Sequence, residues 1–310
     1  MEYGAHLPLI GLDAGTPSLG ALREYAATAS RLGYSHLCAN DHLLFSQPWL
    51  DGPTALAAVL DRAEGMTLAT TVCLPVIRGP VQAAKTLSAL DVLSGGRLVV
   101  GLGPGSSARD YAAVGVPFDE RWPRFEEATQ ALRALLHAEQ PPFAGEHYST
   151  HDVTLEPPPA QRPGTPLWIG SWGSRPGLRR VARLADGWLA SGYNTTPDVF
   201  DAARSYLETR LAAEGKRAEG FPNGLATVWL HVTEDRAAAE RMLQNVLAPM
   251  LNRPVETLRE LSLPIGGAET CAERLTAFAA AGVERVFVWP LGDELRQLEL
   301  FREHVVPLVG

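Results

Sequence analysis

Hydrophobic and polar positions follow two different periods along this chain. Short apolar runs, bounded by Gly, Pro or Asp, are typical of strands buried on both faces of a parallel sheet. Longer stretches rich in Ala, Leu and Arg separate these runs and indicate helices. We predict eight strands, at Tyr3–Pro8, His36–Asp41, Met66–Leu74, Leu98–Gly103, Leu167–Ser171, Gly187–Ser191, Ala226–Val232 and Arg285–Pro290.

Helical patterns follow most of the predicted strands. They lie at Leu19–Leu32, Val81–Leu93, Arg124–Leu136, Gly177–Leu184, Pro197–Ala213, Arg236–Leu251, Ala268–Ala281 and Leu295–Pro307. Eight strand–helix units within 310 residues favour a (β/α)8 TIM-type barrel. An open, doubly wound α/β sheet is the alternative that the same alternation allows.

We interpret residues 1–310 as a single barrel domain with insertions near residues 104–123, 140–166 and 252–267. The second insertion, Pro141–Pro166, is rich in Pro, His, Ser and Thr. It contains a short alternating piece, His147–Leu155, which predicts a hairpin rather than a linker.

The net charge and the cysteine content of the chain argue against several classes of protein. The net charge of −8 argues against a nucleic-acid groove or a polybasic membrane patch. No stretch has the roughly 18 uninterrupted apolar residues that a membrane span needs, and the first residues lack the pattern of a signal peptide. The three cysteines, Cys38, Cys73 and Cys271, are widely spaced, so we expect no disulfide framework and a cytoplasmic protein.

Candidate chemistry lies where the predicted strands end, because barrel enzymes place their catalytic groups at the carboxyl ends of the strands. Asp41 and His42 form the sharpest pair, since a His beside a carboxylate can move a proton near neutral pH. The alternative is a His that only ties a loop to the barrel. The other strand-end candidates are His6, Trp49, Thr70, Thr71, Val72, Gly103, Gly105, Ser106, Ser107, Gly170, Ser171, Trp172, Gly173 and Trp289.

This rim is polar, weakly charged and rich in Trp, which suits a large planar cofactor that carries a phosphate. The segment Gly170–Gly177 is the best phosphate site, since it combines free backbone N–H groups with a following helix N-terminus. A tight turn without a ligand is the alternative. The glycine cluster Gly101–Gly105 does not complete a dinucleotide-binding motif, and no His or Cys set completes a metal site.

Several segments of the chain resemble the bacterial luciferase-like family of flavin- or deazaflavin-dependent oxidoreductases. The matching pieces are YGAHLP, GYSHLCANDH, LATTVCLPVIRGPVQAAKTLSALDVLSGGRLVVGLGPGS, GVPFDERWPRFEE, PLWIGSWGSRPGLRRVARLADGW and AGVERVFVWP. The resemblance implies a TIM-type barrel, a homodimer and a cofactor at the carboxyl end of the strands. The Asn-Asp-His pattern and the glycine loop look more like the coenzyme F420 branch, with FMN as the alternative cofactor.

The resemblance also implies roles for individual residues. His42 becomes the proton-handling residue beside the cofactor ring, with Asp41 next to it. Thr71 and Val72 match the position of a non-prolyl cis peptide bond behind the ring, and Gly103–Ser107 and Gly170–Gly173 would line the cofactor's tail and phosphate. Trp49 and Trp289 would face the substrate.

The implied reaction is hydride transfer between F420 and a small organic substrate. In the FMN alternative, reduced flavin reacts with oxygen and a separate reductase supplies it, and a non-catalytic flavin-binding protein is a third hypothesis. Sugar-phosphate dehydrogenases of the F420 branch carry an acidic residue where this chain has Ser106. That difference speaks against a sugar-phosphate substrate.

Overall fold

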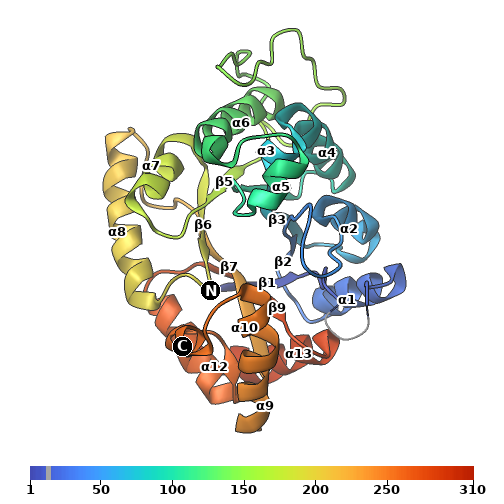
Figure 1. Cartoon of the computed structure of the whole chain (residues 1–310), viewed down its shortest axis with the longest axis vertical. Coiled ribbons are helices and arrows are strands. Elements are labelled where there is room, and N and C mark those ends of the chain that lie inside the picture. Colours follow the sequence, from blue (N-terminus) through green and yellow to red (C-terminus); the bar gives the residue numbers. More distant parts are fainter. Residues whose placement is uncertain (12–14) are drawn as a thin grey trace.

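Eight parallel strands close into a barrel at the centre of the molecule (Figure 1). The structure is a computed structural model, and it describes residues 1–11 and 15–310. The barrel strands are β1 (Glu2–His6), β2 (His36–Ala39), β3 (Thr67–Cys73), β4 (Leu98–Leu102), β5 (Leu167–Gly170), β6 (Gly187–Ser191), β7 (Asn223–Val232) and β9 (Arg285–Pro290). All eight predicted strands are confirmed, and so is the (β/α)8 barrel.

The strands pair in chain order, and two further pairings close the ring. β1 pairs with β2 and with β9, β6 pairs with β7, and β7 pairs with β9. A short additional strand, β8 (Ile265–Gly266), extends from the end of β7 and was not predicted. Closure leaves the carboxyl ends of all eight barrel strands on one rim.

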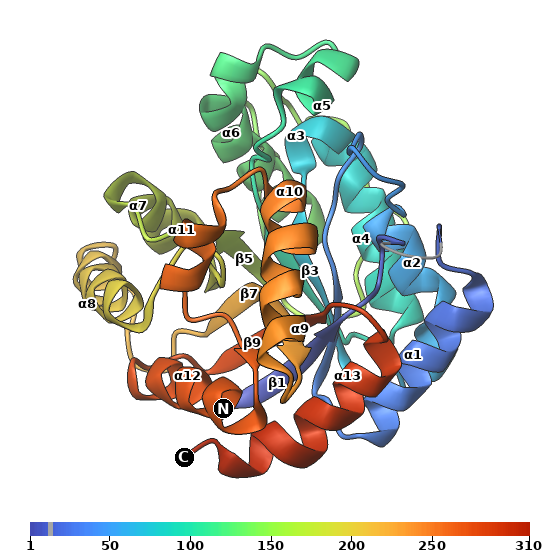
Figure 2. The same cartoon turned by 60° about the horizontal axis from the view of Figure 1, so that its bottom comes forward.

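Helices surround the barrel (Figures 1 and 2). The helices are α1 (Leu19–Arg31), α2 (Gly52–Ala58), α3 (Pro75–Arg78), α4 (Pro80–Leu93), α5 (Ala108–Ala113), α6 (Arg121–Leu136), α7 (Arg175–Leu184), α8 (Pro197–Ala213), α9 (Arg236–Arg241), α10 (Ala248–Leu251), α11 (Val255–Glu260), α12 (Ala268–Ala280) and α13 (Glu294–Leu300). A π-helical turn, η3 (Met242–Leu247), joins α9 to α10, so the predicted helix Arg236–Leu251 is continuous in Figure 2. Within the described residues, no helix is both long and apolar enough to cross a membrane.

Local sequence fixes where these helices begin. The side chains of Ser18, Ser174 and Thr196 each accept a hydrogen bond from a backbone N–H in the first turn of α1, α7 and α8. Proline follows the cap in α7 and α8, where its missing N–H costs nothing. The capping residues therefore fix where these loops end and the helices begin.

The insertion at 140–166, which the structure describes in full, corrects one expectation. His147–Leu155 contains no strand. Residues 143–150 form a short antiparallel turn, in which Ala144 bridges Ser149 and the N–H groups of Gly145 and Thr150 donate to the carbonyls of Tyr148 and Phe143 at 2.9 Å and 2.8 Å. The carboxylate of Glu127 on α6 accepts hydrogen bonds from the backbone N–H groups of residues 146, 147 and 148. The expected hairpin is therefore present only as this turn, which is attached to a helix.

Candidate active site

An irregularity near the end of β3 brings predicted residues of three strand ends together. The peptide bond between Thr71 and Val72 is cis, as the resemblance implied, and the pairing of β3 with β4 shifts register there. The side chain of Val72 then lies over two glycines. A Cβ atom added at Gly103 would lie 2.6 Å from its Cγ2, and one added at Gly170 would lie 3.2 Å from its Cγ1. Only glycine leaves room for Val72 at the first of these positions.

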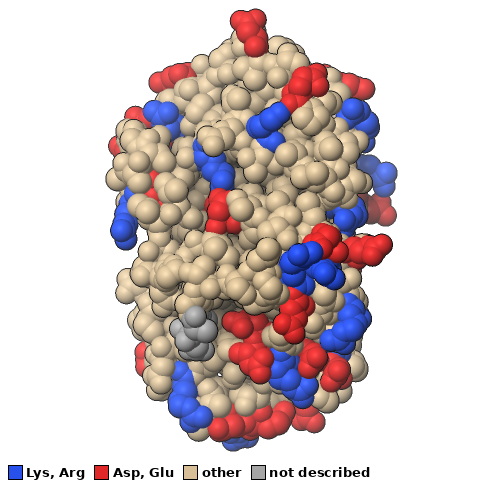
Figure 3. All heavy atoms as spheres, turned by 90° about the vertical axis from the view of Figure 1, so that its right-hand side faces the viewer, with Lys and Arg blue, Asp and Glu red and all other residues tan. Residues whose placement is uncertain are grey.

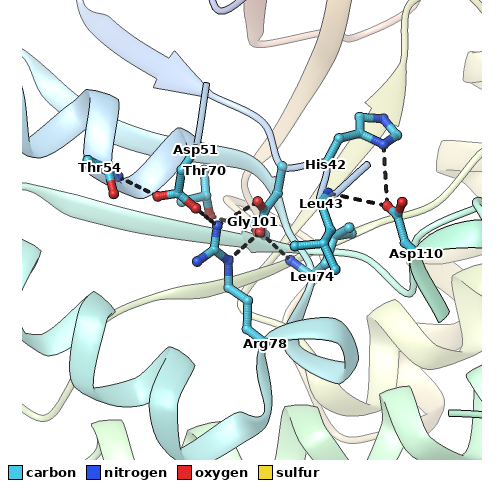
Figure 4. A network of polar contacts seen from close by, with 10 residues as sticks. His42, Leu43, Asp51, Thr54, Thr70, Leu74, Arg78, Gly101 and Asp110 are labelled. Atoms are coloured by element: carbon cyan, nitrogen blue, oxygen red, sulfur yellow. Dashed lines mark hydrogen bonds and ion pairs between the residues drawn. The ribbon is translucent and has the colours of Figure 1, made fainter. Parts of the chain in front are cut away.

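His42 lies in the loop after β2, close to a carboxylate that the sequence analysis did not identify. Its Nδ1 atom is 3.6 Å from Oδ2 of Asp110, just beyond the usual length of a hydrogen bond (Figure 4). Asp110 is buried on α5 and accepts hydrogen bonds from the backbone N–H groups of Leu43 (3.4 Å) and Leu44 (3.1 Å). The same carboxylate therefore holds the loop that carries His42 and faces its ring.

Burial decides the charge of His42. Desolvation lowers the pKa of this imidazole below its usual value, and the nearby carboxylates of Asp110 and Asp41 raise it by less. The ring is therefore neutral at pH 7 and has a nitrogen free to accept a proton. Because Asp110 lies beside Nδ1, Nε2 is the nitrogen left to face a ligand.

The side chain of Asp41 is bound by Arg78 rather than by His42. Its carboxylate receives two hydrogen bonds from the guanidinium of Arg78, at 2.5 Å and 2.7 Å, and one from the backbone N–H of Leu74 at 3.3 Å. Arg78 also pairs with Asp51, which caps α2. The pattern of the sequence did not indicate Arg78, which links the ends of β2 and β3.

Aromatic side chains cover the ends of β1, β7 and β9. The ring of His6 stacks on Trp289 with centroids 3.5 Å apart, and Trp289 stacks on Trp229 at 4.4 Å. Trp49, from the loop after β2, meets Trp289 edge-on at 5.6 Å and His42 at 4.6 Å. The predicted residues His6, His42, Trp49 and Trp289 thus form one cluster, which Trp229 joins.

His6 is fully buried and uncharged. Burial lowers the pKa of its imidazole to about 3. Its Nδ1–H donates to the carbonyl oxygen of Leu7 at 2.7 Å, because a carbonyl can only accept. Nε2 of His6 therefore carries a lone pair, and the side chain of Asn40 lies beside the ring.

Buried polar atoms without a hydrogen-bond partner gather at this end of the barrel. Of the ten such side-chain atoms in the described chain, seven lie at or just beyond strand ends: His6 Nε2, Asn40 Oδ1, His42 Nδ1, Gln47 Oε1, Trp49 Nε1, Thr71 Oγ1 and Trp229 Nε1. Buried polar groups are normally paired, and those left unpaired call for an explanation. Three of these residues have a polar side chain beside them, namely Asp110 at His42, Asn40 at His6 and Cys38 at Thr71. Gln47 Oε1 and the indole N–H groups of Trp49 and Trp229 are left without one.

The remaining predicted residues lie in β3 and at or after the ends of β4 and β5. Thr70 donates to the carbonyl of Gly101 at 2.8 Å, so its hydroxyl ties two strands together. Ser106 is exposed, Gly105 has a φ of +78°, and Ser107 caps α5 through the N–H of Asp110 at 3.1 Å.

The loop after β5 leads into the N-terminus of a helix. Gly173 has a φ of +89° and its N–H points to the hydroxyl of Ser171 at 3.4 Å. Ser174 caps the ten-residue helix α7, and Trp172 is 57% exposed. The loop therefore presents a capped helix N-terminus and an exposed aromatic ring.

Comparison with known proteins gives one consistent result. The family model described as luciferase-like monooxygenase matches residues 5–285. An F420-dependent glucose-6-phosphate dehydrogenase of Intrasporangium calvum is 32% identical over 59% of this chain, and the chain spans 57% of that relative's length. An FMNH(2)-dependent dimethylsulfone monooxygenase of Pseudomonas putida is 27% identical over 92% of this chain and 84% of its own.

Solved structures agree on the fold. An F420-dependent secondary alcohol dehydrogenase, solved with an F420-acetone adduct, aligns over 100% of this chain and 99% of its own, with a TM-score of 0.85 and 18% identity. The monooxygenase RslO1 from Streptomyces bottropensis aligns over 99% of both chains, with a TM-score of 0.84 and 22% identity.

Proposed function

The chain belongs to the luciferase-like monooxygenase family, and from this premise we propose that it is an F420-dependent oxidoreductase acting on a small organic substrate. The observation that carries the proposal is a neutral His42 held beside the buried carboxylate of Asp110 at the barrel rim. Relatives named for F420 dependence support the choice of cofactor. When bound, F420 supplies the carbon that takes or gives a hydride.

The residues at the rim fit a flat cofactor. Val72 over Gly103 and Gly170 gives an apolar backing for a ring, while Thr71 Oγ1 and His6 Nε2 offer unpaired polar atoms beside it. The other residues of the proposed cofactor-binding site are Asp41, Thr70, Gly105, Ser106, Ser107, Ser171, Trp172 and Gly173. Backbone N–H groups at the start of α7 would meet the phosphate.

His42 would handle the proton that accompanies the hydride. A neutral imidazole accepts a proton from a substrate hydroxyl, and the resulting cation is stabilised by Asp110 at 3.6 Å. Asp41 acts from the neighbouring position. Its carboxylate raises the pKa of His42 and, through Arg78, fixes the loop that carries the ring.

A second candidate is an FMN-dependent monooxygenase supplied by a separate reductase. The dimethylsulfone monooxygenase that matches 92% of the chain favours it. The rim residues named above could bind the ring of F420 or that of FMN, so the affinity for each cofactor must be measured. The third possibility, a barrel that binds flavin without catalysis, predicts that His42 is dispensable.

We further propose that residues 1–310 form one domain and that two copies associate as a cytoplasmic homodimer. Figure 3 shows the side of the molecule that carries α2 and α4, where a broad area has few charged side chains. Val81, Val92 and Leu93 of α4 have exposed side chains, Leu93 by 68%. The three cysteines are buried and unpaired, which suits a reducing compartment.

The decisive experiment is a fluorescence titration of the apo-protein with F420 and with FMN. Micromolar or tighter binding of F420 with weak FMN binding supports the proposal, and the reverse order overturns it in favour of the monooxygenase. His42→Ala separates catalysis from binding. We expect it to keep the affinity for F420 and lose turnover, whereas unchanged turnover would leave only a binding role.

A further inference from the structure

We propose that Thr227 is a positioning residue for His42, acting through a β-bulge in the middle of β7 and the aromatic stack that this bulge orients. The inference rests on the proposed function, because it concerns the surroundings of the residue that handles the proton. Thr227 has a φ of +55°, in the left-handed region that a β-branched residue rarely adopts. Backbone strain of this kind persists only where the surrounding structure holds it, and it is concentrated at functional sites.

The register between β7 and β9 locates the bulge. Before it, Leu225 pairs with Val286. After it, Val228 pairs with Val288. Three steps along β7 therefore match two steps along β9, and Thr227 lies within the longer path. An extra residue of this kind bends its strand and changes the direction of the side chains that follow.

The strand on the other side of β7 leaves room for the bulge. Gly192, which follows β6, donates its N–H to the carbonyl of Ala226 at 2.7 Å. A Cβ atom added at Gly192 would lie 3.1 Å from the carbonyl oxygen of Thr227 and 2.7 Å from Cγ2 of Val228. A glycine at this position therefore provides the space that the bulge occupies, and the bulge is a built feature of the barrel.

The bulge decides which side chains of β7 turn inward. Successive side chains of a regular strand point to opposite faces, so residues three apart lie on opposite faces. Leu225 and Val228 nevertheless both pack in the core between the barrel strands and the surrounding helices. The extra residue thus brings Trp229 to the inner face, where it pairs with Trp289 and stacks on it at 4.4 Å. Regular alternation from Leu225 would turn Trp229 outward.

The side chain of Thr227 gives no local reason for the strain. It is partly exposed, and its hydroxyl makes no hydrogen bond to any residue that the structure describes. A threonine also has no conformational advantage over glycine at a positive φ. The inward direction of Trp229 is therefore what the strained backbone provides.

Aromatic contacts carry this orientation from the bulge to His42. Trp289 stacks on Trp229 at 4.4 Å and on His6 at 3.5 Å. Trp49 meets Trp289 edge-on at 5.6 Å and lies 4.6 Å from the imidazole of His42. Burial is the largest influence on the pKa of His42 and lowers it. Displacement of these rings would admit water to the imidazole and raise its pKa toward the ordinary value of 6.5.

The first test is a series of substitutions at position 227. Thr227→Gly and Thr227→Asn introduce residues that adopt a positive φ readily, so both should keep the bulge. Thr227→Pro fixes a negative φ and should remove it. The exciton band of the stacked Trp229–Trp289 pair in circular dichroism should persist in the first two variants and disappear in the third. Loss of the band in Thr227→Gly, or its persistence in Thr227→Pro, would overturn the inference.

Trp229→Leu tests the second half of the argument and remains informative if Thr227→Pro does not fold. We expect kcat with F420 to fall at least about tenfold while the Kd of F420 changes less than about twofold. The pKa of His42, followed by NMR of its ring without cofactor, should rise toward 6.5. The carboxylates that face this ring, Asp110 and Asp41, are unchanged in the variant.

The matched control is Phe301→Leu, which shortens another fully buried aromatic side chain. Phe301 packs edge-on against Tyr3 at 5.2 Å in the core between strands and helices, so the pKa of His42 and kcat should stay unchanged. An unmoved pKa of His42 in a folded Trp229→Leu variant would overturn the inference. A wild-type protein without F420 turnover would instead refute the proposed function, since the dichroism and the NMR titration need no cofactor.

Discussion

The buried, neutral state of His6 predicts a specific loss of stability in acid. Its pKa is about 3 in the folded chain, because burial disfavours the imidazolium, and about 6.5 in the unfolded chain. Below pH 6.5 the unfolded chain binds a proton that the folded chain does not, so the free energy of unfolding falls as the pH falls toward 3. From pH 7 to pH 5 this one residue should cost about 2 kcal/mol.

The substitution His6→Phe isolates that contribution. Phenylalanine keeps an aromatic ring to stack on Trp289 but cannot titrate, so urea unfolding at pH 7 and pH 5 should differ by about 2 kcal/mol less than in the wild type. His36→Phe should behave similarly, since burial lowers the pKa of His36 to about 4. His151→Phe, at an exposed position, controls for the substitution itself. A wild-type pH difference that survives His6→Phe would refute the reasoning.

Three further outcomes follow from the described contacts. Asp110→Asn removes a charge that raises the pKa of His42, so the acidic limb of the kcat/KM profile should move to lower pH; an unmoved limb would contradict this role. Arg78→Met leaves the buried Asp41 carboxylate without its cation and should lower the free energy of unfolding by about 3 kcal/mol, whereas the double variant with Asp41→Asn should recover part of the loss in urea titrations. Glu127→Gln weakens the acceptor of three backbone N–H groups, so hydrogen exchange at residues 146–148 should accelerate while the barrel amides keep their rates.

The strands were predictable because a parallel strand covered on both faces must be apolar at successive positions. The Arg285–Pro290 strand matches its prediction residue for residue. Short helices within the predicted insertions were missed, since α5 has only six residues and is defined by its Ser107 cap rather than by a period. The alternation in His147–Leu155 overstated the hairpin, because antiparallel pairing stops after the turn at 143–150 and the backbone of the loop is bound by Glu127 on α6.

The residues at the rim fall into two groups, those that the sequence indicated and those that it did not. Those on strand ends, such as His6, Val72 and Trp289, could be named because the barrel assigns a position to every strand end. Asp110 and Arg78 could not be named from the sequence, because each lies on a helix that follows a strand. The spacing of residues along the chain does not show which of these helices returns to the rim. A carboxylate in the first turn of a short capped helix was the one available indication of Asp110.

The side chains that pack on Trp229 and Trp289 come in large part from one contiguous stretch between β7 and β9, whereas His42 and Asp110 come from the first half of the chain. The cover over this end of the barrel and the histidine–carboxylate pair are thus encoded in separable parts of the polypeptide. An exchange of residues 233–264 would replace much of that cover and leave both members of the pair in place. Such an arrangement would let one barrel diversify by recombination.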